Sequence, residues 1–440
     1  MRVAFLTLGC KVNFYETGKM AKMFEEAGHE VVPFEEYADV YIVNTCTVTN
    51  IASRKSRQML NKAKKINPEA LIVAAGCYAD EVIKKDGTGM DTFFFIPNKD
   101  KKDIVNIICA RMDKTGREVK NISRQHITKT YNGHTRAYIK IQDGCTQFCT
   151  YCIIPYVRGE LKSRDAINVV KEAEELAING CKEVVITGIH ISSYGAVTDK
   201  ADEFVKLQGK PLLSLLKAVN NIDGIERIRL GSLEPRIISR SFIEGLASVT
   251  KLCPHFHLSL QSGSDTVLKR MNRHYTTEEY LAGLEITRKY FENPAITTDI
   301  ITGFPGETEE EFEETMDFAK KAGFAKVHVF KYSRRYGTIA DKMDGQVSGE
   351  VKAERSARLS ALEKELGIKY QEEALKEYEK VLFEEIAEID SKKYITGYNE
   401  RYMRIAVPAE NIACAETFCN TITGVHITGR TESGILTGTI

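Results

Sequence analysis

Short apolar runs alternate with helical patterns over the first 130 residues. Each run is rich in β-branched residues and is bounded by turn residues, which is typical of a buried strand. The runs cover 2–10, 39–46 and 71–77, and helical patterns over 14–27 and 51–66 separate them. Alternating strands and helices predict a parallel sheet covered by helices, so we expect an α/β domain over 1–130.

The same alternation continues over 131–370 with more units. Six apolar runs read as strands, at 137–142, 183–189, 227–233, 255–261, 295–303 and 326–333. Helical patterns cover 165–178, 212–219, 277–290 and 308–322. A complete β/α barrel has eight such units. We therefore expect a partial (β/α)6 barrel, open on one side, with its chemistry at the carboxyl ends of the strands.

The pattern changes after a charged helix predicted over 356–380. Short apolar runs separated by polar or glycine-containing turns fill the rest of the chain, at 381–389, 393–399, 401–409, 420–429 and 434–440. This pattern is typical of a small antiparallel β-barrel. The sequence thus predicts three domains, over 1–130, 131–370 and 371–440.

Composition narrows the function classes. The chain has 43% apolar and 28% charged residues, which is ordinary for a globular protein. It has neither an apolar run long enough for a membrane span nor the features of a secretory signal, so we expect a cytoplasmic protein without membrane contact. Lys plus Arg equals Asp plus Glu at 61 each, so any nucleic-acid contact must come from local basic patches.

Cysteine is the informative residue type. Eleven cysteines in a reducing compartment favour metal binding or catalysis over disulfides. Cys10, Cys46 and Cys77 each end one of the first three predicted strands. Because parallel strands end at the same edge of a sheet, these three thiols are expected to meet there, which makes simple core packing of all three a poor explanation.

Three more thiols lie in DGCTQFCTYC, residues 143–152, directly after the first barrel strand. The spacing of Cys145, Cys149 and Cys152 would also place them on one face of a helix, but the polar neighbours and Pro155 argue against a buried helix. A redox pair at Cys149 and Cys152 would leave Cys145 unexplained. Thiolates select zinc or iron-sulfur clusters, and a complete site takes four ligands. A set of three leaves one metal position for a substrate or cofactor.

These motifs carry a family resemblance. The Cys-x3-Cys-x2-Cys loop resembles the signature of radical S-adenosylmethionine (SAM) enzymes. Six segments, in the same order along the chain, resemble the methylthiotransferase family within that superfamily, and most closely its members that act on N6-threonylcarbamoyladenosine in tRNA. They are TLGCKVN, VNTCTVT, AAGCYA, YIKIQDGCTQFCTYCIIPYVRG, LSLQSGSDTVLKRMNRHY and DIITGFPGETEEEF.

The resemblance implies a chemistry and its cofactors. Two 4Fe-4S clusters are expected, one on Cys145, Cys149 and Cys152 that cleaves SAM, and one on Cys10, Cys46 and Cys77 that delivers sulfur. The reaction would add a methylthio group to carbon 2 of N6-threonylcarbamoyladenosine next to the anticodon of tRNA, with SAM as radical source and methyl donor. A side-chain base offers no route to that C–H bond, which is not acidic enough. A reductant such as flavodoxin or ferredoxin is implied, and the third domain would be a TRAM domain.

Candidate SAM contacts follow the second and third barrel strands. Thr187 and Gly188 resemble the segment that meets the SAM amino group, although they depart from the Gly-Gly-Glu of the wider superfamily. Ser232 and Glu234 would meet the ribose or carboxylate, but Glu234 could instead be a structural partner of Arg229 or Arg236. The segment GFPGET at 303–308 resembles the loop that meets the adenosyl side of SAM, and its alternative is a plain strand-to-helix turn with two glycines and a capping Thr. Polar groups of Arg158, Ser163 and Arg164 could serve SAM or RNA.

Two basic patches could bind tRNA phosphates. The predicted helix after Cys46 carries Arg54, Lys55, Arg57, Lys62, Lys64 and Lys65 without an acidic residue, although a solvated helix face explains this equally well. Lys331, Tyr332, Arg334 and Arg335 form a second patch with an aromatic ring for stacking. The last 60 residues hold five Lys or Arg and eight Asp or Glu, so any RNA contact there would use local residues such as Lys392, Lys393, Arg401 and Arg404.

Two other functions stay open from the residues alone. The same enzyme chemistry could act on isopentenyladenosine in tRNA or on a ribosomal protein. A non-enzymatic RNA-binding scaffold with two structural metal sites would hold zinc and would be colourless. The remaining cysteines, Cys109, Cys181, Cys253, Cys414 and Cys419, show no ligand spacing and are interpreted as packing.

Overall fold

The structure, a computed structural model, describes residues 1–86, 92–114, 135–197, 200, 202–375, 377–411 and 414–440. The chain forms two compact units. The first unit consists of Met1–Asn132, Asp143–Glu160 and Ser333–Asp341, and the second of Gly133–Gln142, Leu161–Tyr332 and Lys342–Ile440. Within the described ranges, no helix combines the length and the apolar character that crossing a membrane requires.

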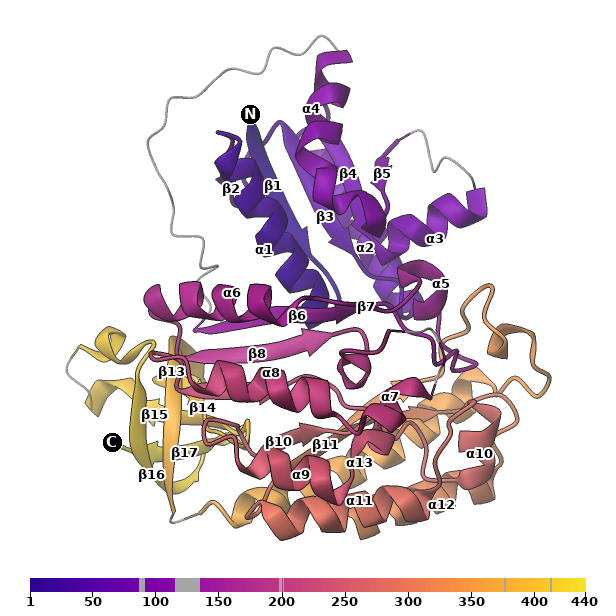
Figure 1. Ribbon diagram of the computed structural model, residues 1–440, viewed down its shortest axis with the longest axis vertical. Helices are drawn as coiled ribbons and strands as arrows, with labels where there is room; N and C mark the ends of the chain where they lie inside the picture. The colour runs from indigo at the N-terminus through magenta and orange to yellow at the C-terminus, as the bar shows by residue number, and fades with distance from the viewer. Residues whose placement is uncertain (87–91, 115–134, 198–199, 201, 376, 412–413) are drawn as a thin grey trace. The chain divides into compact units, whose positions relative to one another are not determined.

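A five-stranded parallel sheet forms the centre of the first unit (Figure 1, indigo to purple). Its order is β2-β1-β3-β4-β5. The strands are β1 (Arg2–Thr7), β2 (Glu30–Val32), β3 (Val40–Thr45), β4 (Leu71–Gly76) and β5 (Phe94–Ile96). The three strands expected from the apolar runs are confirmed, and the two short ones were not foreseen because three residues leave almost no pattern.

Helices cover both faces of this sheet. On one face α1 (Lys11–Glu26) and α4 (Ile104–Lys114) pack on Val3, Val40 and Ile42. On the other face α2 (Asn50–Ile66) and α3 (Cys77–Asp86) pack on Ala4, Tyr41 and Val43. Alternate residues of each strand therefore enter opposite cores, as the pleat requires. The unit also contains η1 (Asn98–Asp103) and α5 (Ile154–Arg158).

Six parallel strands of the second unit form the partial barrel that the alternation predicts. They are β6 (Arg136–Asp143), β8 (Glu183–Gly188), β9 (Arg227–Leu230), β10 (His255–His257), β11 (Ala295–Thr302) and β12 (Lys326–Lys331). Hydrogen-bonded neighbours are parallel, and two bridges, Ile228 to Leu252 and Leu233 to Leu258, continue the sheet from β9 toward β10. The short strand β7 (Lys162–Ser163) is added beside β6.

Helices between the strands form the outer layer of the barrel (Figure 1). They are α6 (Ala166–Ile178), α7 (Glu203–Leu207), α8 (Lys210–Asn220), α9 (Arg240–Ala247), α10 (Asp265–Arg270), α11 (Thr277–Tyr290) and α12 (Glu309–Ala322). Short 3-10 turns are η2 (Ile191–Ser193), η3 (Pro235–Ile237) and η4 (Ala340–Lys342), of which Ala340 and Asp341 belong to the first unit. The helix predicted over 356–380 was misplaced, because α13 runs from Gly349 to Glu372, seven residues earlier at its start.

The last strands of the second unit close into a small barrel, β13-β14-β15-β17-β16. The strands are β13 (Tyr378–Ile389), β14 (Lys392–Tyr398), β15 (Arg404–Pro408), β16 (Ile422–Arg430) and β17 (Leu436–Thr439), with η5 (Ala409–Asn411) and η6 (Ala415–Phe418) between β15 and β16. All neighbours are antiparallel except β15 and β17, which are parallel. Phe383, Ile395 and Val425 fill its core.

Candidate functional site

The first thiol set lies where the strands of the first unit end. Cys10 is the N-cap of α1, three residues past β1. Cys46 directly follows β3, and Cys77 directly follows β4 as the first residue of α3. Adjacent parallel strands therefore carry all three to one edge of the sheet, as the sequence predicts.

Contacts around Cys46 show how closely this edge is packed. A Cβ added to Gly9 would lie 2.8 Å from Cys46 Cβ and 2.9 Å from its Sγ, so the chain before Cys10 runs directly against Cys46. Burial raises the pKa of the Cys46 thiol to about 11, and the neighbouring Cys77 and Cys10 thiols add to the rise. The three sulfur atoms thus share one electrostatic environment.

Arg158 connects this edge with the second thiol loop. It lies six residues after Cys152, and its Nε donates to Cys77 Sγ at 3.3 Å. Its two terminal nitrogens bind Glu16 at 2.5 Å and Asn13 at 2.8 Å, and Lys101 reaches the same Glu16 carboxylate at 2.6 Å. Arg158 also pairs with Asp143 at 3.4 Å, so two carboxylates balance the two buried cations beside Cys77. Sequence reasoning assigned Arg158 to SAM or RNA and missed this position.

The second thiol loop belongs to the same unit and is not helical. Residues 144–149 have no regular secondary structure, so the alternative of a cysteine stripe on a helix is excluded. Cys145 N donates to Gly159 O at 3.2 Å, and Cys152 N donates to Cys149 O at 2.9 Å. All three cysteines are in the thiol form, not in disulfides, and are partly exposed. They are therefore open to a ligand rather than sealed in a core.

One buried polar atom beside each thiol set has no hydrogen-bond partner within the described part of the chain. Asn98 Oδ1 is one, and the amide nitrogen of the same side chain lies 3.7 Å from Cys77 Sγ. Thr146 Oγ1, next to Cys145, is the other. Buried polar groups are normally paired. The Thr146 hydroxyl can donate to an acceptor on a bound group, and three thiols in each set are suitable ligands for iron, so the residues of both sets fit an iron-sulfur cluster.

The residues predicted to contact SAM lie at the carboxyl ends of β8 and β9. Thr187 is buried and Gly188 ends β8. A Cβ at Gly188 would approach Gln142 O and Ile191 Cγ2 to 2.9 Å each, so glycine is required there for packing alone. Ser232 is exposed just past β9.

Glu234 is not a free carboxylate. It is buried, its Oε2 accepts from Arg236 N at 2.8 Å, and its Oε1 accepts from Arg236 Nε at 2.9 Å. Arg273 adds a longer ion pair at 3.8 Å. Of the structural partners considered from sequence, Arg236 is the one observed, while Arg229 pairs with Glu183 instead.

His190 is a polar residue at this end of the barrel that sequence reasoning missed. Its Nδ1 shares a hydrogen bond with Ser193 Oγ at 2.7 Å, and its Nε2 is buried without a partner in the described structure. Burial lowers the pKa of this imidazole to about 4, so it is neutral at pH 7. The signal available in the sequence was its position two residues after Gly188.

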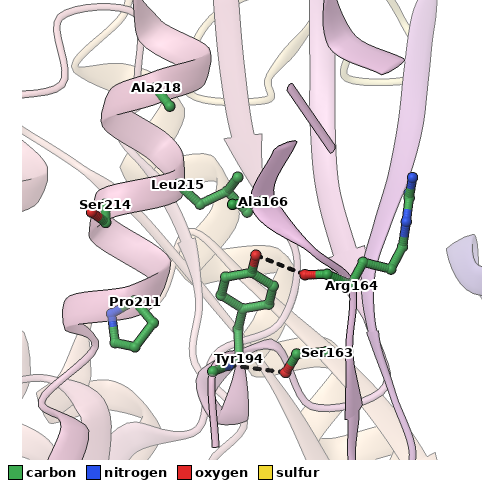
Figure 2. A pocket seen from close by; sticks show the side chains of 9 residues that line it. Ser163, Arg164, Ala166, Tyr194, Pro211, Ser214, Leu215 and Ala218 are labelled. Atoms are coloured by element: carbon green, nitrogen blue, oxygen red, sulfur yellow. Dashed lines mark hydrogen bonds between the residues drawn. The ribbon is translucent and has the colours of Figure 1, made fainter. Parts of the chain in front are cut away.

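Ser163 and Arg164 line an apolar pocket of about 450 Å³ next to α8 (Figure 2). Ser163 Oγ accepts from Gly195 N and Arg164 O accepts from Tyr194 Oη, each at 2.9 Å. The Arg164 guanidinium binds Lys140 O at 2.8 Å and Glu172 at 2.7 Å. These hydrogen bonds hold the connection between β7 and α6 in place.

The two basic patches differ in the structure. The six basic side chains predicted on α2 are all exposed, and Lys62 pairs with Glu35 at 3.3 Å. In the second patch Tyr332 is buried against Phe304, so the prediction of a stacking ring was wrong. Arg335 is buried on Thr47 and Glu81 and is unavailable to RNA.

Comparisons with known proteins agree with this architecture. Residues 139–319 match the model of the radical SAM superfamily, and residues 2–91 match the uncharacterized protein family UPF0004. In fold, the chain resembles the radical SAM methyltransferase TsrM from Kitasatospora setae with a TM-score of 0.52 and 15% identity, covering 77% of this chain and 76% of TsrM.

Closer relatives match along nearly the whole chain. The threonylcarbamoyladenosine tRNA methylthiotransferase MtaB of Bacillus subtilis is 41% identical, covering 92% of this chain and 89% of the relative. MtaB of Aquifex aeolicus is 39% identical, covering 82% and 88%. A tRNA-2-methylthio-N(6)-dimethylallyladenosine synthase from Thermoanaerobacter sp. is 36% identical, covering 88% and 83%. The chain therefore belongs to the methylthiotransferase family of the radical SAM superfamily.

Proposed function

We propose that this protein is a tRNA methylthiotransferase that adds a methylthio group to carbon 2 of N6-threonylcarbamoyladenosine next to the anticodon, with SAM as radical source and methyl donor. The names of the relatives that are 41% and 39% identical support this substrate. A relative at 36% identity is named for dimethylallyladenosine, so that nucleoside is the second candidate.

One observation carries the proposal. Both thiol sets belong to the first unit, and Arg158, six residues past Cys152, donates to Cys77 Sγ. The buried guanidinium, whose charge is compensated by Glu16 and Asp143, thereby joins the segment after the second thiol loop to the sheet edge that carries Cys77. Sulfur insertion by two centres gives this arrangement a purpose.

The residues assigned to each centre follow from the thiol chemistry. Cys145, Cys149 and Cys152 would hold one 4Fe-4S cluster together with SAM, and Cys10, Cys46 and Cys77 would hold a second. Such clusters supply the electron for SAM cleavage and a coordination position for sulfur. Arg158 and Asn98 would orient Cys77 and exclude water, and the Lys101–Glu16 pair would fix Arg158.

SAM is proposed to lie along the carboxyl ends of β8 and β9, against Thr187, Gly188 and Ser232. Glu234 would act through Arg236, which it fixes by two hydrogen bonds, rather than by touching SAM itself. The unpartnered Nε2 of His190 offers this end of the barrel one further polar group.

We propose three functional domains over 1–130, 131–370 and 371–440, in a cytoplasmic enzyme that takes electrons from a reductant such as flavodoxin or ferredoxin. The anticodon loop of tRNA would be bound by the exposed basic side chains of α2 and, in the last domain, by Lys392 and Lys393, which are exposed. Arg401 is left out of this set because its guanidinium pairs with Glu379.

The substrate is tested by mass spectrometry of tRNA nucleosides. A host strain that lacks the 2-methylthio derivative of N6-threonylcarbamoyladenosine should gain it when it expresses this protein. A variant with Cys149→Ala should not restore it. Appearance of the isopentenyladenosine derivative alone would select the second candidate, and no change in any methylthiolated nucleoside would reject both.

Absorbance of the anaerobically purified protein separates the enzyme from a zinc-bearing scaffold. An enzyme with iron-sulfur clusters is expected to be brown and to lose colour in air. A colourless protein that contains zinc and does not cleave SAM would contradict the enzymatic proposal.

A further inference from the structure

Three side chains of metal-ligand type come together on neighbouring strands of the second unit. His257, Asp299 and His328 belong to β10, β11 and β12, and one ligand atom of each lies within 4.8 Å of the others. Asp299 is directly opposite His328, and His257 is opposite Thr297, two residues before Asp299. The register of the parallel strands therefore fixes the cluster on rigid backbone.

The cluster lies on the inner face of the barrel. His255, two residues before His257, shares the same face of its strand. Its ring lies 5.1 Å from that of Tyr402, which also stacks on Arg229 at 4.6 Å. The opposite face of the strands, with Thr298 and Ile300, is fully buried and packs on the outer helices, since Tyr280 of α11 hydrogen-bonds the Thr298 side chain and donates to Leu258 O at 2.9 Å. The three side chains thus point away from the outer helices and keep partial solvent access.

The geometry suits coordination by nitrogen and oxygen. His257 Nε2 lies 3.3 Å from Asp299 Oδ2, and the rings of His257 and His328 are 5.7 Å apart. On its other side, His257 Nδ1 is 3.0 Å from Thr297 Oγ1. With Nδ1 as the donor, the Nε2 lone pair faces the cluster, which is the way second-shell partners orient metal-binding histidines.

A structural ion pair without a metal explains only part of this arrangement. Such a pair would consist of His257 and Asp299, and it gives no reason for the second imidazole, that of His328, at the same point. Two imidazoles and one carboxylate form a ligand set for divalent first-row transition ions and leave coordination positions open. We propose that His257, Asp299 and His328 form a site for one such ion on the inner face of the barrel. This proposal stands whether or not the proposed function holds.

The test measures binding of Mn2+ to the full-length protein with its cysteine sites reconstituted and excess iron removed. Oxidised 4Fe-4S clusters give no resonance signal, so free and bound Mn2+ can be followed by electron paramagnetic resonance. We expect one bound ion per chain. Asp299→Asn, which keeps the shape of the side chain, should weaken its affinity at least about tenfold, and His257→Ala and His328→Ala should do the same.

A matched control is the exposed pair of His274 and Asp202, 3.8 Å apart in the same unit. His274→Ala should leave Mn2+ binding unchanged. Thr297→Val removes only the partner of His257 Nδ1 and should weaken binding by about 10-fold to 100-fold while the circular dichroism spectrum is retained. Absence of bound Mn2+ in the wild type, or binding that Asp299→Asn leaves unaltered, would overturn the proposal.

Discussion

At the scale of single residues, the edge that carries Cys10, Cys46 and Cys77 tolerates very little added volume. Gly9 and Gly28 flank α1 and both have left-handed φ, +100° and +80°. A Cβ at Gly9 would collide with Cys46, whereas nothing lies within 4 Å of the same position at Gly28. A comparison of alanine substitutions at Gly9 and Gly28 can therefore distinguish the cost of backbone strain from the effect of displacing the Cys46 thiol.

Gly9→Ala is expected to lower the iron content of the reconstituted protein, because the methyl group displaces Cys46. Gly28→Ala should cost about 1–2 kcal/mol of stability from its backbone alone and should keep its iron. Iron assay and thermal unfolding of both variants test this pair. Equal iron loss in both variants would contradict the assignment of the effect to Cys46.

Candidate site residues could be predicted from the sequence where they form a recurring motif. They could not be predicted where their role depends on whether the fold buries them. The six cysteines stand out because strand ends and a three-thiol motif mark them. Nothing local reveals that Tyr332 is buried against Phe304, whereas the pairing of Glu234 with Arg236, only two residues away, was one of the alternatives expected from the sequence. Interpreting Cys414 as packing was wrong, since it is exposed.

At the scale of elements, α12 illustrates how local signals fix a helix. Thr308 caps it in a reciprocal capping box with Glu311, whose carboxylate also binds Arg270 at 2.6 Å. The hydrogen bond from Arg270 is the main cause that lowers the pKa of Glu311 to about 2. A depressed folded-state pKa stabilises the protein above the unfolded value near 4.5, and this contribution is lost as the pH falls toward 2.

Glu311→Gln should therefore destabilise the protein by about 1 kcal/mol at pH 7, a figure reduced for solvent screening. The difference between wild type and variant should shrink as the pH falls from about 5 toward 2. Thermal unfolding of the cluster-free chain across this range measures it. A difference that stays constant with pH would show that Glu311 acts only as an uncharged cap.

Most elements could be predicted because strands and helices of this chain have clear periodicities. The predicted helix over 277–290 coincides with α11, and that over 308–322 with α12 and its capping residue. The predicted helix ends were wrong where the hydrophobic periodicity is weak. The exposed and highly charged helix α13 carries few buried residues, so its start at Gly349 and its end before Tyr378 were missed.

At the scale of the whole molecule, a buried charge cluster ties the C-terminal barrel to the β/α barrel within the second unit. Glu183 is fully buried and binds Arg229 at 2.7 Å, with Arg227 at 3.8 Å. Both arginines donate to backbone carbonyls of the C-terminal barrel, Arg227 to Lys380 O at 2.6 Å and Arg229 to Glu400 O at 2.8 Å. The three arginines near Glu183 hold its pKa below the usual range against the effect of burial.

Glu183→Gln is expected to destabilise the second unit by about 3 kcal/mol, because it leaves buried guanidinium groups without their carboxylate. Limited proteolysis should then cleave the chain near the start of β13 faster than in the wild type. The control is Glu226→Gln, at the surface pair with Lys182, which should leave both the stability and the cleavage rate unchanged. Unchanged cleavage in Glu183→Gln would show that this cluster does not secure the C-terminal barrel.

The exposed basic face of α2 gives a prediction for tRNA binding. Replacing Lys62, Lys64 and Lys65 with Ala should weaken tRNA affinity and reduce its salt dependence by about two units of logarithmic slope, as expected for about three phosphate contacts. Binding titrations at several salt concentrations measure both. A second triple variant at the exposed Lys320, Lys321 and Lys326 should leave the slope unchanged. A salt slope that is unchanged in the variant at Lys62, Lys64 and Lys65 would contradict tRNA binding by the basic face of α2.

The sequence predicts the order of the α/β, (β/α)6 and small β-barrel parts, but not how the compact units are composed. Domains were expected as continuous segments, whereas the first unit includes Asp143–Glu160 and Ser333–Asp341 from within the barrel segment. This grouping depends on contacts such as those of Arg158 with Glu16 and Arg335 with Glu81, which link residues more than a hundred positions apart. No local pattern encodes them.

The most direct test of the account is the iron content after anaerobic reconstitution of three proteins. They are the wild type, a triple Ala variant at Cys10, Cys46 and Cys77, and a triple Ala variant at Cys145, Cys149 and Cys152. Two 4Fe-4S clusters predict about eight iron atoms per wild-type chain and about four in each variant. About four in the wild type, unchanged by loss of Cys10, Cys46 and Cys77, would contradict the two-centre account.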